Sequence, residues 1–275
     1  MKKVIMVLIL VLISGKAFAE NFNVGGKQLI IPSPQGYVPV TEKMGWLYRY
    51  NLQKVDPMND QLAFYISTVD AQSITAGKTQ RIERFFLLNV NKSYKELLID
   101  SKEFGEIKAE VKKKNKNTQK SALSIMFDPI DKMNKGVSKE FNVDFKMEIP
   151  ELNALDPHSE TDRALAYSLY RNTSFMVESE KRTSKESLTV TFLNVSGKLF
   201  YLYCWGPHDD LEWTRTASKI WANRIIASNP PPPQHSEGIS KIDWRKIGAK
   251  VIAAMFLTGI ASIIVALSRM MRKKN

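Results

Sequence analysis

The sequence predicts an α+β fold with a largely antiparallel sheet and packing helices, plus one C-terminal transmembrane helix. Three observations lead to this prediction. Short runs of β-forming residues follow one another late in the chain with turn residues between them, as in antiparallel strands. An apolar stripe at three- and four-residue spacing comes directly after them and indicates a helix. Near the C-terminus, residues 251–268 contain no charged side chain, and an apolar run of this length is typical of a membrane span.

The first 19 residues have the layout of a secretory signal peptide. Lys2 and Lys3 precede an apolar run over 4–13, and Ala17 and Ala19 provide a small-residue cleavage site. An apolar run of this length forms about 15 Å of helix, which is too short for a hydrocarbon core of about 30 Å. We therefore expect cleavage after residue 19, with an uncleaved anchor as the weaker alternative. The short, lysine-rich signal suits a bacterium, in which the exported domain enters the periplasm.

Three strands and one helix are expected in the first part of the exported chain. Residues 28–31, 37–40 and 61–69 are rich in β-forming side chains, and prolines and a glycine separate the first two. Residues 82–98 carry apolar side chains at three- and four-residue steps with basic side chains between them, which predicts an amphipathic helix packed on the core. The apolar positions are Ile82, Phe85, Phe86, Val90, Tyr94, Leu97 and Leu98.

Residues 101–121 are polar and rich in lysine. We expect a helix that continues into a solvated loop, because such a run has few apolar side chains to bury. The alternative is a contact site for an anionic lipid or polymer at Lys112, Lys113, Lys114 and Lys116. Most of the formal net charge of +12 belongs to the two terminal segments, so the exported domain is nearly balanced and nucleic acid is not an expected partner.

The second part of the exported chain contains the strongest strand signals. Two weaker candidates come first, at 123–127 and 141–149. Runs of alternating β-forming residues then predict strands at 164–170, 188–193 and 199–205. The last two strands are separated by a short segment with Gly197, where a hairpin turn can use a positive φ.

Residues 199–205 are apolar at alternate positions on both faces, which predicts a central strand that is covered on both sides. The sole cysteine, Cys204, lies in this strand, so an intrachain disulfide is excluded. We expect a buried, inert thiol there, with an exposed thiol that forms an intermolecular bridge as the alternative.

A helix is expected after the last strand, with Asp209 as its cap and Glu212 three residues later. Its apolar stripe consists of Leu211, Trp213, Ala217, Ile220, Trp221 and Ile225. Four consecutive prolines from Pro230 end the helix. The expected organisation is a signal peptide (1–19), an α+β domain (20–229), a Pro-rich stalk (230–246), a transmembrane helix (247–268) and a basic cytoplasmic tail (269–275).

The expected membrane helix carries small side chains at four-residue intervals, namely Ala254, Thr258, Ser262 and Ala266. Such a stripe lets a second helix approach closely, which would permit a homo-oligomer or contact with a partner's helix. A chance distribution of small residues is the alternative. Basic residues after this helix stay in the cytoplasm under the positive-inside rule, so the domain faces the periplasm.

No pattern in the sequence indicates catalysis, a metal or a cofactor. His158 lies in an acidic turn, His208 precedes two aspartates, and His235 falls in the expected stalk. No nucleophile motif accompanies them, and one cysteine with scattered histidines does not match the spacing of zinc ligands. Turn and capping roles account for the acidic clusters. We expect no cofactor and no metal.

Residues 31–40 (IPSPQGYVPV), the strand 196–205 (SGKLFYLYCW) and the helix 211–226 (LEWTRTASKIWANRII) occur in an order that resembles the PsbP/Mog1/DcrB-like α/β/α sandwich proteins. The resemblance covers 28–50 and 187–228. It implies an early strand with a Pro-Gly turn and a final strand that leads into a C-terminal helix. It also implies a role as a binding or assembly accessory. The lysine-rich segment and the C-terminal anchor depart from that pattern.

The sequence therefore leads us to expect a protein of the bacterial inner membrane, single-pass, with its main domain in the periplasm. It would act by binding a protein partner or an envelope ligand and would not be an enzyme. The alternative is a membrane-tethered periplasmic hydrolase with an unrecognised active site. A pocket that places His158 or His208 beside a nucleophile would favour the hydrolase, whereas exposed histidines on separate loops would favour the binding protein.

Overall fold

A computed structural model describes residues 19–53, 59–78, 82–115 and 118–234, with side chains described outside 114–129. An eight-stranded sheet forms the centre of the molecule, in the order β3-β4-β5-β10-β9-β8-β6, with β7 also paired to β8. All of these pairs are antiparallel. The α+β prediction with a largely antiparallel sheet is thus confirmed. The strands are β3 (Tyr37–Pro39), β4 (Asn59–Ser67), β5 (Phe85–Asn91), β6 (Phe145–Ala154), β7 (Ser159–Glu160), β8 (Ala164–Val177), β9 (Glu180–Val195) and β10 (Lys198–Pro207).

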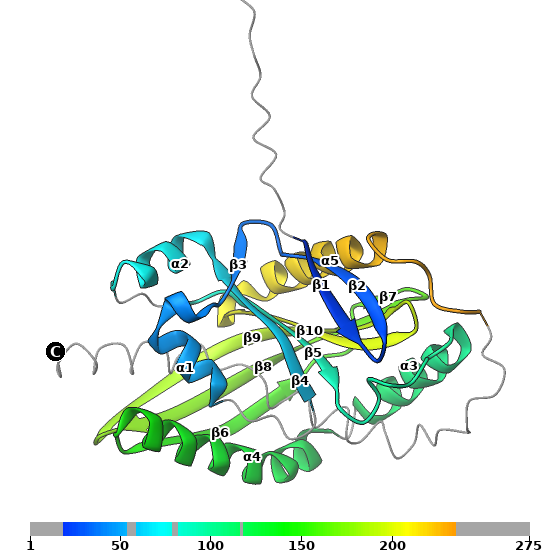
Figure 1. Ribbon diagram of the computed structural model, residues 1–275. Coiled ribbons are helices and arrows are strands. Elements are labelled where there is room, and N and C mark those ends of the chain that lie inside the picture. The colour runs from blue at the N-terminus through cyan, green and yellow to red at the C-terminus, as the bar shows by residue number, and fades with distance from the viewer. Residues whose placement is uncertain (1–18, 54–58, 79–81, 116–117, 235–275) are drawn as a thin grey trace, which may run out of the picture.

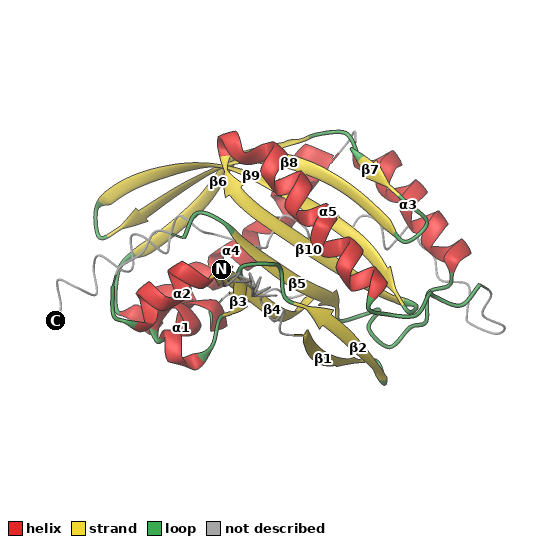
Figure 2. Cartoon of the chain, turned by 90° about the horizontal axis from the view of Figure 1, so that it is seen from above, coloured by secondary structure: helices red, strands yellow, loops and turns green. Residues whose placement is uncertain are grey.

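Helices cover one face of the sheet, and a helix with a hairpin covers the other. The first layer contains α1 (Trp46–Leu52), α2 (Thr68–Thr75), α3 (Ser101–Asn115) and α4 (Thr118–Phe141), which contribute to one apolar core cluster. On the opposite face, α5 (Leu211–Ala227) crosses the central strands beside the separate hairpin of β1 (Ala19–Val24) and β2 (Lys27–Pro32) (Figures 1 and 2). Single-turn helices Glu42–Met44 and His208–Asp210 precede α1 and α5.

The late strands agree with the sequence prediction. Strands β8, β9 and β10 contain all three predicted runs. The β9–β10 turn uses Ser196 and Gly197 at φ values of 52° and 85°, the left-handed region that a two-residue hairpin turn requires. Strand β10 is buried on both faces, and Cys204 is completely buried, as expected for a central strand.

Three segments between residues 82 and 127 differ from the prediction in whole or in part. The expected helix at 82–98 is wrong, because Phe85–Asn91 forms strand β5 between β4 and β10. All of its residues are buried, so both faces are apolar and the alternation that marks a half-exposed strand is lost. The expected strand at 123–127 is also wrong, since these residues lie within α4. The helix–loop prediction for 101–121 is correct only for its helical part, because α4 already begins at Thr118.

Two asparagines cover exposed strand edges. On α4, Asn134 accepts a hydrogen bond from Met147 N (3.0 Å) and donates one to Met147 O (3.2 Å), at the outer edge of β6. After α5, Asn229 makes the same pair of bonds to Ile30 on β2, at 3.0 and 2.7 Å. A side-chain amide has the donor and acceptor of a peptide group, so each asparagine replaces one residue of a neighbouring strand.

The start of the expected stalk lies against the domain. Pro230 O accepts hydrogen bonds from Arg163 Nη2 (3.1 Å) and Ser196 Oγ (2.9 Å). Pro233 O accepts one from Ser101 N (3.2 Å), at the first residue of α3. The proline run is therefore part of the folded domain.

Within the described ranges, no helix is long and apolar enough to cross a membrane. The expected signal peptide up to residue 18, the stalk from residue 235, the transmembrane helix and the tail lie outside these ranges. The same holds for Ala254, Thr258, Ser262 and Ala266. These expectations stay predictions.

Candidate binding site

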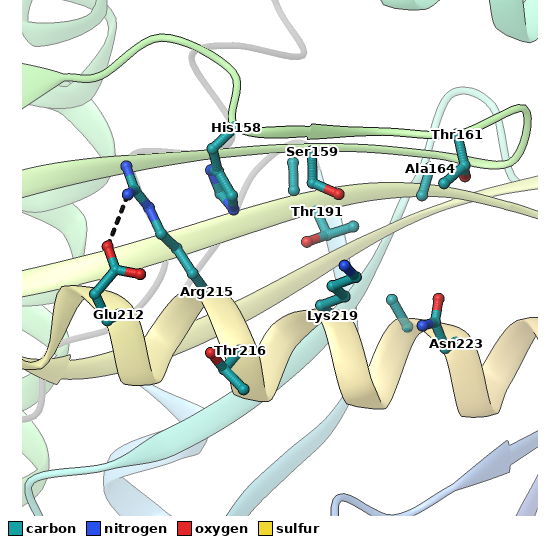
Figure 3. A pocket seen from close by; sticks show the side chains of 12 residues that line it. His158, Ser159, Thr161, Ala164, Thr191, Glu212, Arg215, Thr216, Lys219 and Asn223 are labelled. Carbon is teal, nitrogen blue, oxygen red and sulfur yellow. Dashed lines mark hydrogen bonds and ion pairs between the residues drawn. The ribbon is translucent and has the colours of Figure 1, made fainter.

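A cavity of about 280 Å³ lies beside α5, where the helix faces strand β7 and the adjoining parts of β8 and β9 (Figure 3). The strands and the residues that flank β7 contribute His158, Ser159, Thr161, Ala164, Ala166 and Thr191, and the helix contributes Glu212, Arg215, Thr216, Lys219, Ala222 and Asn223. We call this cavity the polar pocket. The pocket exists because β8 and β7 extend beyond the edge of α5, which packs mainly on β9 and β10.

Hydroxyl groups line the interface between α5 and the sheet. Thr189 Oγ1 is 2.9 Å from both Ser168 Oγ and Thr214 Oγ1, and Thr191 Oγ1 is 2.8 Å from Ser218 Oγ. Each of these hydroxyls can donate and accept, so the burial of the groups is compensated. The helix stripe predicted from apolar residues is only partly correct, because Thr214 and Ser218 are buried while Ile220 is 52% exposed.

His158 forms one wall of the polar pocket. Its backbone N donates to Ala166 O at 3.0 Å, which fixes the segment before β7 against β8. Its Nδ1 is 3.5 Å from Ser168 Oγ. Burial and the positive charge of Arg215 lower the pKa of His158 to about 4, although Glu212 acts in the opposite direction. The ring is therefore neutral at pH 7.

Two cationic side chains extend from α5 toward the strands in Figure 3. Arg215 Nη1 donates to Glu212 Oε1 (2.9 Å), and its Nε donates to Ser168 Oγ (3.3 Å). Lys219 lies one turn later on the same side of the helix. No acidic side chain of the described residues pairs with Lys219, whereas the only acid that lines the pocket, Glu212, already pairs with Arg215. The pocket thus holds an excess of positive charge.

A second groove, of about 360 Å³, lies on the other side of α5. We call it the aromatic groove, since Tyr37, Phe86, Trp213 and Trp221 line it with Pro34, Gln35, Ala217, Ile220 and Arg224. Phe86 contacts Tyr37, Trp213 and Trp221 edge to face, with ring centres 4.7–5.9 Å apart. These contacts make the aromatic wall a rigid surface.

The lysines predicted as an anionic contact site have different surroundings in the structure. Lys112 Nζ is 2.8 Å from Glu160 Oε2, and Lys108 pairs with the same carboxylate at 3.2 Å. Lys113 is exposed. The side chain of Lys114 and all of Lys116 lie outside the described residues. The pair at Glu160 places this part of α3 next to β7, on the far side of that strand from the pocket.

The histidines do not assemble a hydrolytic site with the serine nearest to them. His158 does lie in a pocket beside Ser168, but Ser168 is completely buried and its hydroxyl contacts Thr189 and Arg215. A substrate carbonyl has no access to a nucleophile in that position. His208 lies elsewhere, with its ring tilted by 32° against that of Tyr170 and the ring centres 4.4 Å apart. In the described ranges, no group of three or more His, Cys, Asp or Glu side chains is arranged to hold a metal ion.

The predicted cap of α5 is also different in the structure. Asp210 stands at the cap position in place of Asp209, and its side chain makes no capping bond to the helix. Its carboxylate instead accepts hydrogen bonds from Arg84 Nε (2.6 Å) and Nη2 (3.1 Å). Arg84 in turn lies 4.7 Å from the centre of the Trp213 ring. The acid therefore ties the start of α5 to β5 beside the aromatic groove.

No protein-family model matches the sequence, and no curated protein matches it. Among solved structures, the chain is similar to the Saccharomyces cerevisiae Ran-binding protein Mog1p, at 10% sequence identity and a TM-score of 0.25, over 78% of this chain and 93% of that one. At this TM-score the two structures superpose poorly as whole molecules, so the architecture described above rests on this chain's own sheet order.

Proposed function

We propose that the protein is a binding or accessory protein of the bacterial envelope, anchored by a single C-terminal helix in the inner membrane, with its domain in the periplasm. The anchor and the orientation are supported by the sequence alone, through the uncharged run at 251–268 and the signal-like N-terminus. In this proposal the domain acts by contact with a protein partner and performs no catalysis.

The observation that carries this proposal is the surface of α5, which has a concavity along each side. The aromatic groove combines Trp213, Tyr37 and Arg224, residue types that contribute most of the energy at protein interfaces. Ile220 is 52% exposed on the same helix. A fixed helix with an apolar, aromatic border suits the recognition of a protein partner better than it suits a chemical reaction.

Site-directed photocrosslinking in native membranes tests the contact. A photoreactive residue at Ile220 should give one defined adduct whose partner is identified by mass spectrometry, and the partner's own tagged form should capture this protein in return. The matched control is Val69 on α2, which is 67% exposed but lies away from α5. Equal adducts from both positions, or adducts with a second copy of the chain alone, would contradict an accessory role through α5.

The topology needs its own experiment. A reporter fused after Asn275 should be active only if it functions in the cytoplasm, and the mature protein should stay in the membrane fraction after a carbonate wash. A periplasmic reporter signal or release by carbonate would reject the anchored topology.

A membrane-tethered hydrolase is the second candidate, because the polar pocket contains a neutral imidazole beside hydroxyl side chains. Purified full-length protein would then hydrolyse activated esters, and H158Q would reduce the rate by at least about 100-fold, the typical contribution of a general base. Equal background rates for the wild type and H158Q would exclude this use of the pocket.

A further inference from the structure

The charged side chains that line the polar pocket carry a net positive charge. Arg215 and Lys219 enter it from α5, and the carboxylate of Glu212 is engaged by Arg215. Behind strand β7, Glu160 is neutralised by Lys108 and Lys112 at 3.2 and 2.8 Å. Each of these two carboxylates is paired with a base, which weakens its repulsion of an approaching anion.

The neutral groups of the pocket have a matching chemistry. Asn223 contributes an amide and His158 an imidazole (Figure 3), and Thr216 lines the pocket with a hydroxyl, whereas the hydroxyl of Thr191 is already bonded to Ser218. Hydroxyl, amide and imidazole N–H groups donate to the oxygens of an anion, and the lysine ammonium and arginine guanidinium strengthen such bonds. These donors come from α5 and from the segment that precedes β7, so they lie on two sides of the cavity.

We propose that the polar pocket binds the oxyanion group, carboxylate or phosphate, of a small molecule, with Lys219 as the main ionic contact. The inference rests on the proposed function, because it assigns a ligand class to one of the two concavities beside α5. The cavity volume of about 280 Å³ is slightly below the range of drug-sized ligand sites, about 300–1,000 Å³. The pocket therefore suits a compact ligand rather than a segment of polymer.

Calorimetric titration of the full-length protein in detergent, at constant ionic strength, tests this inference. Inorganic phosphate and succinate serve as the two probes, and the one that binds more tightly identifies the oxyanion. We expect saturable binding of at least one probe and a loss of affinity of about 10-fold or more in K219Q, equivalent to about 1.4 kcal/mol. K219R keeps the charge and should keep the binding.

Arg224 provides a matched control, because it lies on the same helix but lines the aromatic groove. R224Q removes the same charge and should leave the affinity within about twofold. Absence of saturable binding for both probes, an unchanged affinity in K219Q, or an equal loss in K219Q and R224Q would each overturn the inference. Circular dichroism of each variant shows whether the fold is intact, and K219R decides the matter if K219Q is unfolded.

The imidazole signals of the protein supply a second readout. The chain has only three histidines, so the signal of His158 can be assigned by its loss in H158Q. The charged groups that face its ring are Arg215, Lys219 and Glu212 from α5, with the compensated Glu160 cluster behind β7. Bound anion would add a negative charge, so the pKa of His158 should rise with the probe, and no change at saturation would place the anion elsewhere.

The two proposals can fail separately. If Ile220 captures a defined partner while neither probe binds the pocket, the accessory role stands and the ligand assignment falls. If phosphate or succinate binds through Lys219 while no partner is captured, the anion-binding proposal is supported and the accessory role is rejected.

Discussion

Arg171 and Glu186 form an ion pair inside the core, with side-chain exposures of 1% and 5%. Arg171 Nε donates to Glu186 Oε2 at 3.1 Å, and its guanidinium lies 4.1 Å from the centre of the Trp205 ring. The pair joins neighbouring positions of β8 and β9. The sequence does not indicate that these two residues are buried, because charged residues in long strands usually face the solvent.

Removing one partner of this pair should be costly. We expect E186Q to lower the free energy of unfolding by about 3–5 kcal/mol, because the buried guanidinium loses its counter-charge. The matched control is E180Q on the same strand, whose carboxylate pairs with Arg182 but is 64% exposed, so its effect should be at most about 1 kcal/mol. Urea unfolding curves measure both, and equal effects would show that the buried pair has no special role.

The pKa of His158 predicts a pH dependence of stability. Its folded value of about 4 is below the ordinary value of 6.5, so the unfolded chain binds more protons between these limits. The free energy of unfolding should therefore fall as the pH decreases from about 6.5 to about 4. H158Q removes this contribution, so its urea midpoint should change less than that of the wild type over the same window. Parallel midpoint curves would contradict the depressed pKa.

At the scale of elements, the sequence predicted strands where β-forming side chains fill a short run between turn residues. Strands β4, β8 and β10 were predicted on this basis, although β10 is buried on both faces. For β5 the pattern predicts a helix instead, because complete burial makes Phe85, Phe86 and Val90 apolar regardless of face. Three- and four-residue spacing then arises by chance. Helix α4 was not predicted, although Ile130, Met133, Val137 and Phe141 recur at helical spacing and pack on the core.

The edge contact of α4 leads to a prediction for β6. N134L keeps the approximate volume of the side chain but removes both hydrogen bonds to Met147. We expect a loss of about 1–2 kcal/mol in stability and a tendency to associate, because an uncovered strand edge can pair with another chain. Chemical unfolding and analytical ultracentrifugation measure the two effects. K135Q changes the adjacent, exposed residue and should leave both unchanged.

At the scale of the whole molecule, the sequence predicted the fold class and the sequential antiparallel strands of the second part of the chain. The polar pocket was not predictable in the same way. Its lining comes from β7, β8, β9 and α5, and these segments meet only because β8 extends past the edge of the helix. His158 was singled out, whereas Lys219 and Arg215 looked like ordinary solvent-facing positions of an amphipathic helix.

Labelling of Cys204 tests whether α5 and the β1–β2 hairpin unfold together with the sheet that they cover. Its thiol lies on β10, in the centre of the sheet, and burial raises its pKa well above the ordinary value. We expect no reaction with a thiol reagent in the native state and a labelling rate that follows global unfolding in urea, since no local opening exposes a central strand covered on both faces. Rapid labelling without denaturant would show that α5 and the β1–β2 hairpin detach from the sheet on their own.

The hydrogen bonds accepted by Pro230 and Pro233 determine which residues take up a mechanical force applied to the C-terminal end of the domain. A pull on the chain beyond Gln234 is transmitted first to Ser101 on α3 and then to Arg163 and Ser196 at the end of the central strands. The load is thereby shared among both sides of the sheet before it reaches the last turn of α5. A domain built this way resists being peeled open from its C-terminal helix, so the two concavities beside that helix keep their shape under strain.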